Sequence, residues 1–195
     1  MLIALLRGSG IPARYRHGTL SQQNAQTLIA SMFPEQKFVL DHISKPFIRA
    51  GIMDPWREDL ESLAARSAEL GLPLRAHSEQ LSAMGGTAAA AGLGALSCDH
   101  LEYANSEDVA AMAENDMVAV LLPGAFYFLR ESRRPPVPAL REAGVRMAVA
   151  SDLNPGSSPV PSLLICAHMA CVFFGLSAAE AIEGITRHGA AAMGI

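Results

Sequence analysis

Residues 144–158, GVRMAVASDLNPGSS, combine a strand pattern, an acidic residue and a turn, and they indicate the fold class of the chain. The first half, residues 145–150, is a short apolar run, too short for a helix and typical of a buried strand. It ends at Ser151 and Asp152 and continues into turn-forming residues, NPGS. An acid between a buried strand and a Gly/Ser loop is typical of the active-site edge of parallel α/β proteins. The alternative is that Asp152 only caps a helix starting near Pro161.

The composition limits the class of protein. The chain has 195 residues, of which 50% are hydrophobic and 17% charged, below the roughly 25% of an average soluble domain. We expect one domain over residues 1–195. The net charge of −4 gives no electrostatic argument for nucleic-acid binding. No apolar run is long enough to span a membrane. The three cysteines lie in apolar contexts, as reduced core thiols do, so we expect a cytoplasmic protein.

Strand and helix patterns alternate along the chain. Strands are predicted at residues 11–15, 37–42, 72–77, 95–100, 117–122 and 145–150. Helices are predicted at residues 20–33, 56–70, 84–91, 137–143, 162–174 and 178–187, with a short one beginning at Ser106 and a long loop over residues 124–136. The alternation predicts a parallel sheet, open or closed as a (β/α) barrel. A closed barrel has eight strands. About six units therefore predict an incomplete barrel that lacks its first strands.

Four chemically useful side chains fall at the carboxyl ends of predicted strands: His42, His77, His100 and Asp152. Alternation puts Ala148, Ala150 and Asp152 on one face, and likewise Cys98 with His100 and Arg75 with His77, all expected to point inward. Two imidazoles and a carboxylate can bind Zn²⁺ or Fe²⁺ and leave a position open for water. The metal would lower the pKa of that water to about 7. The alternative is that these side chains are satisfied polar groups of the core.

Several motifs in a fixed order suggest a family. They are RAHSEQL (residues 75–81) followed by Gly85 and Gly86, DHLEY (99–103), LLPGAFYFLRE (121–131), SDLNPGS (151–157) and TRHGAA (186–191). From about residue 70 to residue 195 the chain resembles the C-terminal part of the imidazolonepropionase family, in the amidohydrolase superfamily. The resemblance implies a (β/α) barrel of amidohydrolase type. It also implies hydrolysis of the cyclic amide 4-imidazolone-5-propanoate to N-formimidoyl-L-glutamate, in histidine degradation.

The resemblance also implies roles for individual residues. It makes His77 and Asp152 ligands of one divalent metal, zinc or iron. His100, with Glu79, would orient or deprotonate the attacking water, and Asp152 would carry its proton. Substrate-binding positions are matched by Gln80, Asn154, Gly156 and Ser157. A Gly/Ser loop before a helix offers N–H groups to a carboxylate, which suits that role. The alternatives are that Gln80 merely enters a helix and that residues 154–157 are only a turn.

The chain also departs from this family. Imidazolonepropionases carry a His-x-His pair on the first barrel strand, and this sequence has none. Residues 1–65, with KFVLDHISKP at positions 37–46, resemble lactonase-type amidohydrolases instead. That likeness makes His42 a possible further metal ligand and puts a seam between two families near residues 66–72.

We therefore expect a metal-dependent hydrolase of a small molecule, most like imidazolonepropionase, with two alternatives. One is a lactonase acting on a sugar lactone; the other is a non-catalytic remnant of the fold. With two imidazole ligands missing, the chain alone should be weak or inactive. Its open sheet edges and apolar surface predict a homo-oligomer or a partner that covers them.

Overall fold

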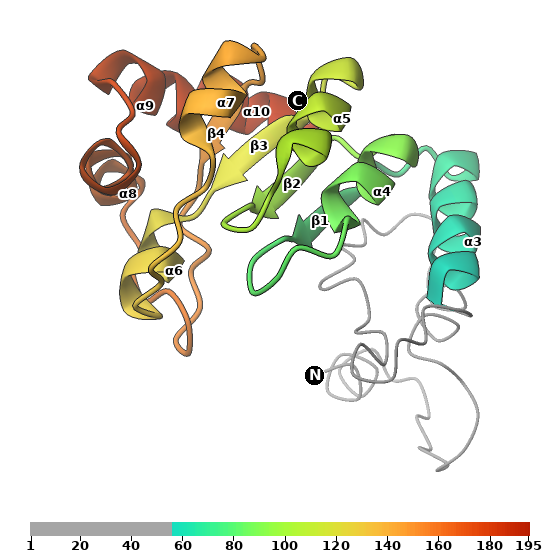
Figure 1. Ribbon diagram of the computed structural model, residues 1–195, viewed down its shortest axis with the longest axis horizontal. Helices are drawn as coiled ribbons and strands as arrows, with labels where there is room; N and C mark the ends of the chain where they lie inside the picture. Colours follow the sequence, from blue (N-terminus) through green and yellow to red (C-terminus); the bar gives the residue numbers. More distant parts are fainter. Residues whose placement is uncertain (1–55) are drawn as a thin grey trace.

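A computed structural model describes residues 56–195 of the chain (Figure 1). The strands predicted at residues 11–15 and 37–42, and with them His42, lie outside the described residues. The elements follow one another in this order: α3 (Trp56–Glu69), β1 (Arg75–Ser78), α4 (Gly86–Gly92), β2 (Ser97–His100), α5 (Ser106–Glu114), β3 (Val118–Leu121), α6 (Pro123–Phe128), α7 (Val137–Glu142), β4 (Met147–Val149), α8 (Leu163–Met169), the π-helix η2 (Ala170–Phe174), α9 (Ala178–Ile185) and α10 (Arg187–Met193).

The strands form a parallel sheet in the order β1-β2-β3-β4. Each strand pairs with the next one in the sequence, through an intervening helix at every crossover. His77 pairs with Asp99, and Val120 pairs with Ala148. The predicted parallel α/β architecture is confirmed. Within the described residues, β1 and β4 are the two outer strands of the sheet.

One face of the sheet is covered by helices and forms the larger core. Figure 1 shows α4, α5 and α7 lying over this face. The strand residues that point into it are Ala76, Cys98, Ala119, Leu121, Met147 and Val149, all of them buried. They pack against apolar side chains of the helices, such as Met112 of α5 and Leu140 of α7, which are fully buried. Burial of this apolar surface is the main force that holds the βα units together.

The opposite face is partly apolar and partly polar. Val118, Val120, Leu122 and Ala148 form a small cluster there with Ala192 of α10. The polar strand residues Arg75, His77, Ser97 and Asp99 also point to this side, where they line a cavity. In a (β/α) barrel this face is the interior. The helix-covered face thus stabilises the fold, and the other face carries the chemistry.

The predicted orientation of Cys98 is wrong. Cys98 lies in the helix-covered core, where burial raises the pKa of its thiol to about 12. Its neighbours Ser97 and Asp99 point to the cavity side. The reason is the parallel register, in which His77 pairs with Asp99, so these two side chains share a face. The three cysteines are all free, as expected, with Cys98 and Cys166 buried.

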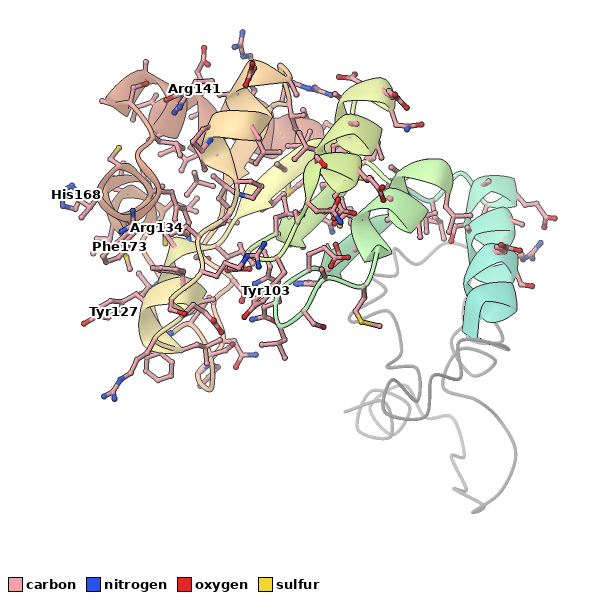
Figure 2. All side chains as sticks on the ribbon, in the orientation of Figure 1. Tyr103, Tyr127, Arg134, Arg141, His168 and Phe173 are labelled. Atoms are coloured by element: carbon pink, nitrogen blue, oxygen red, sulfur yellow. The ribbon has the colours of Figure 1, made fainter. Side chains whose placement is uncertain are left out.

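The segment after β3 also differs from the prediction. Residues 123–128 form the helix α6 rather than part of a long loop. Pro123 occupies its first position, where the missing N–H is no loss. Phe126 packs against Phe173 and Phe174, and Tyr127 stacks on Phe173 (Figure 2). Aromatic burial therefore holds a helix too short to be recognised from its periodicity.

The helices in the last part of the chain differ from the predicted ones. The expected helix over residues 162–174 is the α-helix α8, capped by Ser162, followed by the π-helix η2. Asp152 is thus not the cap of this helix. Beyond α9 a further helix, α10, begins at Arg187 and contributes Ala192 to the cavity side of the sheet. Among residues 56–195 there is no helix of the length and apolarity that crossing a membrane requires.

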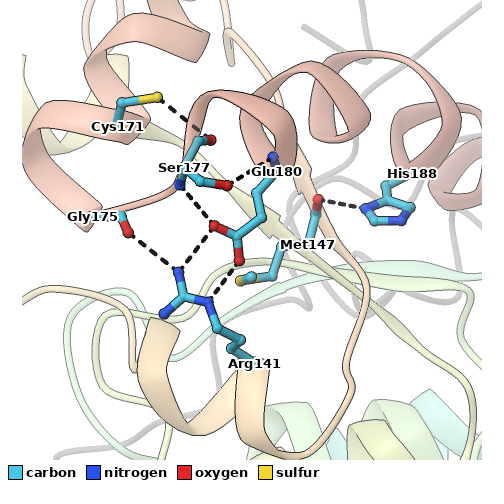
Figure 3. Close-up of polar contacts among 7 residues, drawn as sticks. All are labelled: Arg141, Met147, Cys171, Gly175, Ser177, Glu180 and His188. Carbon is cyan, nitrogen blue, oxygen red and sulfur yellow. Dashed lines mark hydrogen bonds and ion pairs between the residues drawn. The ribbon is translucent and has the colours of Figure 1, made fainter.

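An ion pair joins α7 to α9 beside the turn that precedes β4 (Figure 3). The Arg141 guanidinium donates to both carboxylate oxygens of Glu180, at 2.6 and 3.1 Å, and to the carbonyl of Gly175. Glu180 also accepts from the N–H of Ser177 in a capping box. The hydrogen bonds from Arg141 lower the pKa of Glu180 to about 2. These contacts fix α9 against the helix-covered side of β4.

Candidate active site

A cavity of about 440 Å³ lies on the polar face of the sheet. Arg75 and His77 of β1, Ser97 and Asp99 of β2, and Asp152 after β4 line it, together with apolar residues of β3, β4, α8, α9 and α10. These polar residues come from two neighbouring strands and from the loop after β4. The structure thus brings two of the predicted site residues, His77 and Asp152, to one cavity.

His77 of β1 and Asp99 of β2 lie opposite each other in this cavity. The distance from His77 Nε2 to Asp99 Oδ2 is 3.4 Å. Burial raises the pKa of Asp99 to about 6; His77 and Arg75 oppose this increase, and the nearby charge of Asp152 adds to it. The His100 ring lies beside that of His77, with centroids 5.3 Å apart. Imidazoles and carboxylates are therefore concentrated at the carboxyl ends of β1 and β2.

Asp152 lies next to a turn that several hydrogen bonds hold in place. Asp152 has a left-handed backbone, with φ of 47°. Asn154 and Ser158 pair through both backbone hydrogen bonds, and the buried Ser158 hydroxyl donates to the Ser151 carbonyl at 2.6 Å. A Cβ on Gly124 would lie 2.5 Å from Ser158 Oγ, so any side chain there would displace Ser158. The loop geometry next to Asp152 therefore depends on Ser158 and Gly124.

The loop residues predicted to hold a substrate carboxylate are paired with one another. Gly156 N donates to Asn154 Oδ1 at 2.9 Å, and the N–H groups of Ser157 and Ser158 donate to the Asn154 carbonyl. In this structure the N–H groups of residues 156–158 are thus used within the turn. A ligand contact here would fall to the exposed side chain of Asn154 and the half-buried side chain of Ser157.

Glu79 is fastened to the start of α4. It is buried, with φ of 53°, and accepts from the N–H groups of Met84 at 2.7 Å, Gly86 at 2.5 Å and Thr87 at 3.4 Å. A carboxylate that accepts several backbone N–H groups stabilises a helix start. The geometry thus gives Glu79 a loop-holding contact, next to the half-buried Gln80.

Sequence reasoning missed two acidic residues of this region, Asp99 and Glu102. The pairing of His77 with Asp99 could have been found by extending the face of Arg75 and His77 across the sheet. Glu102 carries no periodic signal, because His100 and Leu101 before it both have left-handed backbones that end the strand alternation. Burial raises the pKa of Glu102 to about 7, and the charges of Glu131 and Asp152 add to this increase.

The described residues supply part of the ligand set for the metal that the resemblance implies. His77 and Asp152 both line the cavity and are suitable ligand types. Within residues 56–195, however, no three His, Cys, Asp or Glu side chains gather closely enough to hold an ion. The described residues alone therefore do not fit a complete metal site.

Solved structures of known proteins identify the fold. The structure resembles an amidohydrolase from a Sargasso Sea sample (TM-score 0.65, 19% identity, 95% of this chain and 44% of that chain) and E. coli guanine deaminase (TM-score 0.65, 14% identity, 93% and 47%). It also resembles a zinc-bound adenosine deaminase of Xanthomonas campestris (TM-score 0.59, 18% identity, 90% and 52%). The fold is part of an amidohydrolase-type (β/α) barrel.

Sequence similarity gives the nearer relationship. The chain is 57% identical over 137 residues to imidazolonepropionase of Verminephrobacter eiseniae, and 61% identical over 132 residues to that of Acidiphilium cryptum. These matches cover 70% and 68% of this chain, but 30% and 32% of those proteins. The predicted resemblance to the imidazolonepropionase family is confirmed, and the chain spans about a third of the curated relatives' length. No family model matches the chain.

Proposed function

We propose that this protein is a metal-dependent amidohydrolase that opens the cyclic amide of 4-imidazolone-5-propanoate to give N-formimidoyl-L-glutamate. The observation that carries the proposal is that His77 of β1 and Asp152, in the loop after β4, line one cavity. Sequence identity of 51–61% to several imidazolonepropionases supports the substrate. We also infer a cytoplasmic location, which the free and mostly buried cysteines support.

The proposal assigns His77 and Asp152 to one divalent ion. Two solved structures of similar fold, an adenosine deaminase and an atrazine chlorohydrolase, are zinc-bound, which supports zinc, with iron as the alternative. Such an ion supplies an acidified water at neutral pH. Because zinc sites use three or four protein ligands, the others would come from outside the described residues or from another chain. His42 is one candidate.

The residues of this chain would bind substrate and move protons. His100, beside His77, is the proposed base that takes a proton from water, and Asp152 is the proposed carrier of that proton to the leaving nitrogen. Asn154 and Ser157, with Gln80 and Gly156, are the proposed substrate contacts. Glu79 would act on the site indirectly, since its carboxylate holds the loop before α4.

The decisive experiment measures metal content and turnover of the purified chain with added Zn²⁺ or Fe²⁺. With an incomplete ligand set, we expect little bound metal and a rate below the usual enzymatic range of about 1–10³ s⁻¹. Co-expression with the His-x-His-bearing part of an imidazolonepropionase should restore imidazolone hydrolysis. Asp152→Ala should abolish the restored rate, whereas Asp116→Ala, an exposed carboxylate at the other edge of the sheet, should leave it unchanged.

Three outcomes would redirect the proposal. Turnover of an aldonolactone but not of the imidazolone would favour the lactonase alternative. No metal and no turnover in the complemented protein would indicate a non-catalytic remnant. A full rate in the chain alone, lost in Asp152→Ala, would show that its own residues suffice. Light scattering tests the related proposal that a second copy or another partner covers the outer strands.

A further inference from the structure

Glu102 is a buried carboxyl group that the proposed mechanism does not yet use. Only 1% of its side chain is exposed, although it lies just beyond β2 and outside any regular element. Within the described part of the chain, its Oε2 atom has no hydrogen-bond partner. Buried carboxylate oxygens are nearly always paired, so an orphaned one calls for a partner that the local geometry can supply.

The two residues before Glu102 have a backbone conformation that is unfavourable for residues with a side chain. His100 and Leu101 have φ of 78° and 72°, a left-handed conformation that is sterically unfavourable for an L-residue. The flanking N–H groups tie this bend to the end of β1: Leu101 N donates to the Ser78 carbonyl at 3.3 Å, and Tyr103 N to the Glu79 carbonyl at 2.6 Å. The strained turn brings Glu102 back alongside His100, and such strain is typical of functional sites.

The two side chains lie close together in a water-poor environment. Glu102 Oε2 is 4.0 Å from His100 Nδ1, and the two side chains are 1% and 4% exposed. The other charges that face Glu102 are those of Glu131 and Asp152, both acidic, and burial raises its pKa to about 7. A negative charge on Glu102 therefore needs a nearby donor, and the His100 ring is the adjacent one.

We propose that Glu102 is a positioning residue for His100: its carboxylate holds the Nδ1–H of the imidazole and leaves Nε2 as the basic nitrogen. A small side-chain movement would bring the 4.0 Å separation to hydrogen-bond contact of about 2.8 Å. Which ring nitrogen carries the proton decides which one acts as a base. The catalytic consequence rests on the proposed function; the contact between the two side chains does not.

The test measures the His100 ring directly by NMR in the full chain labelled with ¹⁵N-histidine, the signal being assigned with His100→Gln. We expect Nδ1 to carry the proton in the wild type. Glu102→Gln keeps an acceptor but removes the charge, so the His100 imidazolium should become about tenfold more acidic. Glu102→Leu removes the acceptor, and the ring should become a mixture of both tautomers. Glu114→Gln, which changes an exposed carboxylate at the end of α5, is the matched control.

Two observations keep the test decisive. If a Glu102 variant does not fold, the same contact is measured from the other side, by titrating the ¹³C-labelled Glu102 carboxyl group in His100→Gln, where its pKa should change. An unchanged tautomer and an unchanged acidity of His100 in the folded Glu102 variants would overturn the proposal. Absence of imidazolone hydrolysis would count against the proposed function alone, because the NMR readout needs no turnover.

Discussion

The two edges of the sheet use the left-handed backbone conformation in opposite ways. At the amino edge, the turns before β1, β2 and β4 contain Gly71, Gly94 and Gly144, with φ of 64°, 76° and 71°. At the carboxyl edge, the same conformation is adopted by residues with side chains: Glu79, His100, Leu101 and Asp152. There are two exceptions: Asp116 before β3, at the amino edge, has φ of 50°, and Gly85, in the loop between β1 and α4 at the carboxyl edge, has φ of 73°.

The difference indicates which edge is optimised for stability. Glycine adopts a positive φ without steric conflict, whereas a side chain there costs about 1–2 kcal/mol. Glycine at the carboxyl edge would relieve this strain but would remove three of the acids and bases discussed above. The carboxyl edge therefore gives up stability for chemistry, as strained functional sites do, and the amino edge does not.

The largest effect is expected at Glu102, at the carboxyl edge. Because burial raises the pKa of this carboxyl from 4.5 to about 7, the folded protein binds the proton more tightly than the unfolded chain does. The resulting stabilisation is fully present below about pH 4.5 and is lost as the pH rises to about 7. Glutamine does not titrate. Glu102→Gln should therefore gain up to about 3 kcal/mol relative to the wild type between about pH 4 and pH 8.

Urea unfolding at about pH 4 and about pH 8 checks this prediction. Glu114→Gln, which removes one exposed carboxylate, is the control. Parallel pH profiles for Glu102→Gln and the wild type would contradict it. They would also weaken the contrast between the two edges, because burial of the Glu102 charge at the carboxyl edge would then not lower the stability of the fold.

The second effect concerns Gly124, whose added Cβ would meet Ser158 Oγ at 2.5 Å. Gly124→Ala should displace Ser158, break its hydrogen bond to the Ser151 carbonyl and destabilise the fold by about 2 kcal/mol. Ser158→Ala alone should lose about 1 kcal/mol. In the double variant the hydroxyl that clashes is gone, so its loss should be smaller than the sum. Strict additivity in chemical unfolding would show that the two residues act separately.

The smallest effects are expected at the amino edge. There, a side chain can be added to a glycine turn, and the aspartate turn can be changed to glycine. A Cβ on Gly94 would meet no atom within 4 Å, so Gly94→Ala should lose only the conformational term of about 1 kcal/mol. Asp116→Gly should gain a similar amount, reduced by loss of its exposed ion pair with Arg146. Thermal unfolding measures both changes. Equal losses in the two variants would remove the conformational argument on which the comparison rests.

The fold was predictable where apolar runs are bounded by turn residues. Strands β3 and β4 were found in this way, because a buried parallel strand is a short apolar run. Strands β1 and β2, RAHS and SCDH, are not apolar runs, because they carry polar side chains toward the cavity. Helix α6 was missed, since PGAFYF is too short to show a period and depends on contacts with Phe173 and Phe174, far along the chain.

The candidate site was predictable to the extent that strand ends were. His77 and Asp152 were found because parallel strands bring their carboxyl ends together, and they do line one cavity. Alternation within one strand misplaced Cys98, since only the pairing of β1 with β2 decides which face it occupies. Glu102 was beyond reach, because the left-handed residues before it follow no repeat. The roles of these residues came from the family resemblance rather than from periodicity.

The pairing of each strand with the next one in the sequence has a consequence for biosynthesis. Arg75 pairs with Ser97, and Ser97 with Val118, so each strand meets its partner after a single crossover along the chain. A strand leaving the ribosome therefore finds its neighbour already made, and β1 to β4 can assemble one unit at a time during translation. Pairing across a single βα unit closes shorter loops than pairing with more distant strands would, and it shortens the period in which unpaired strands are exposed to other nascent chains.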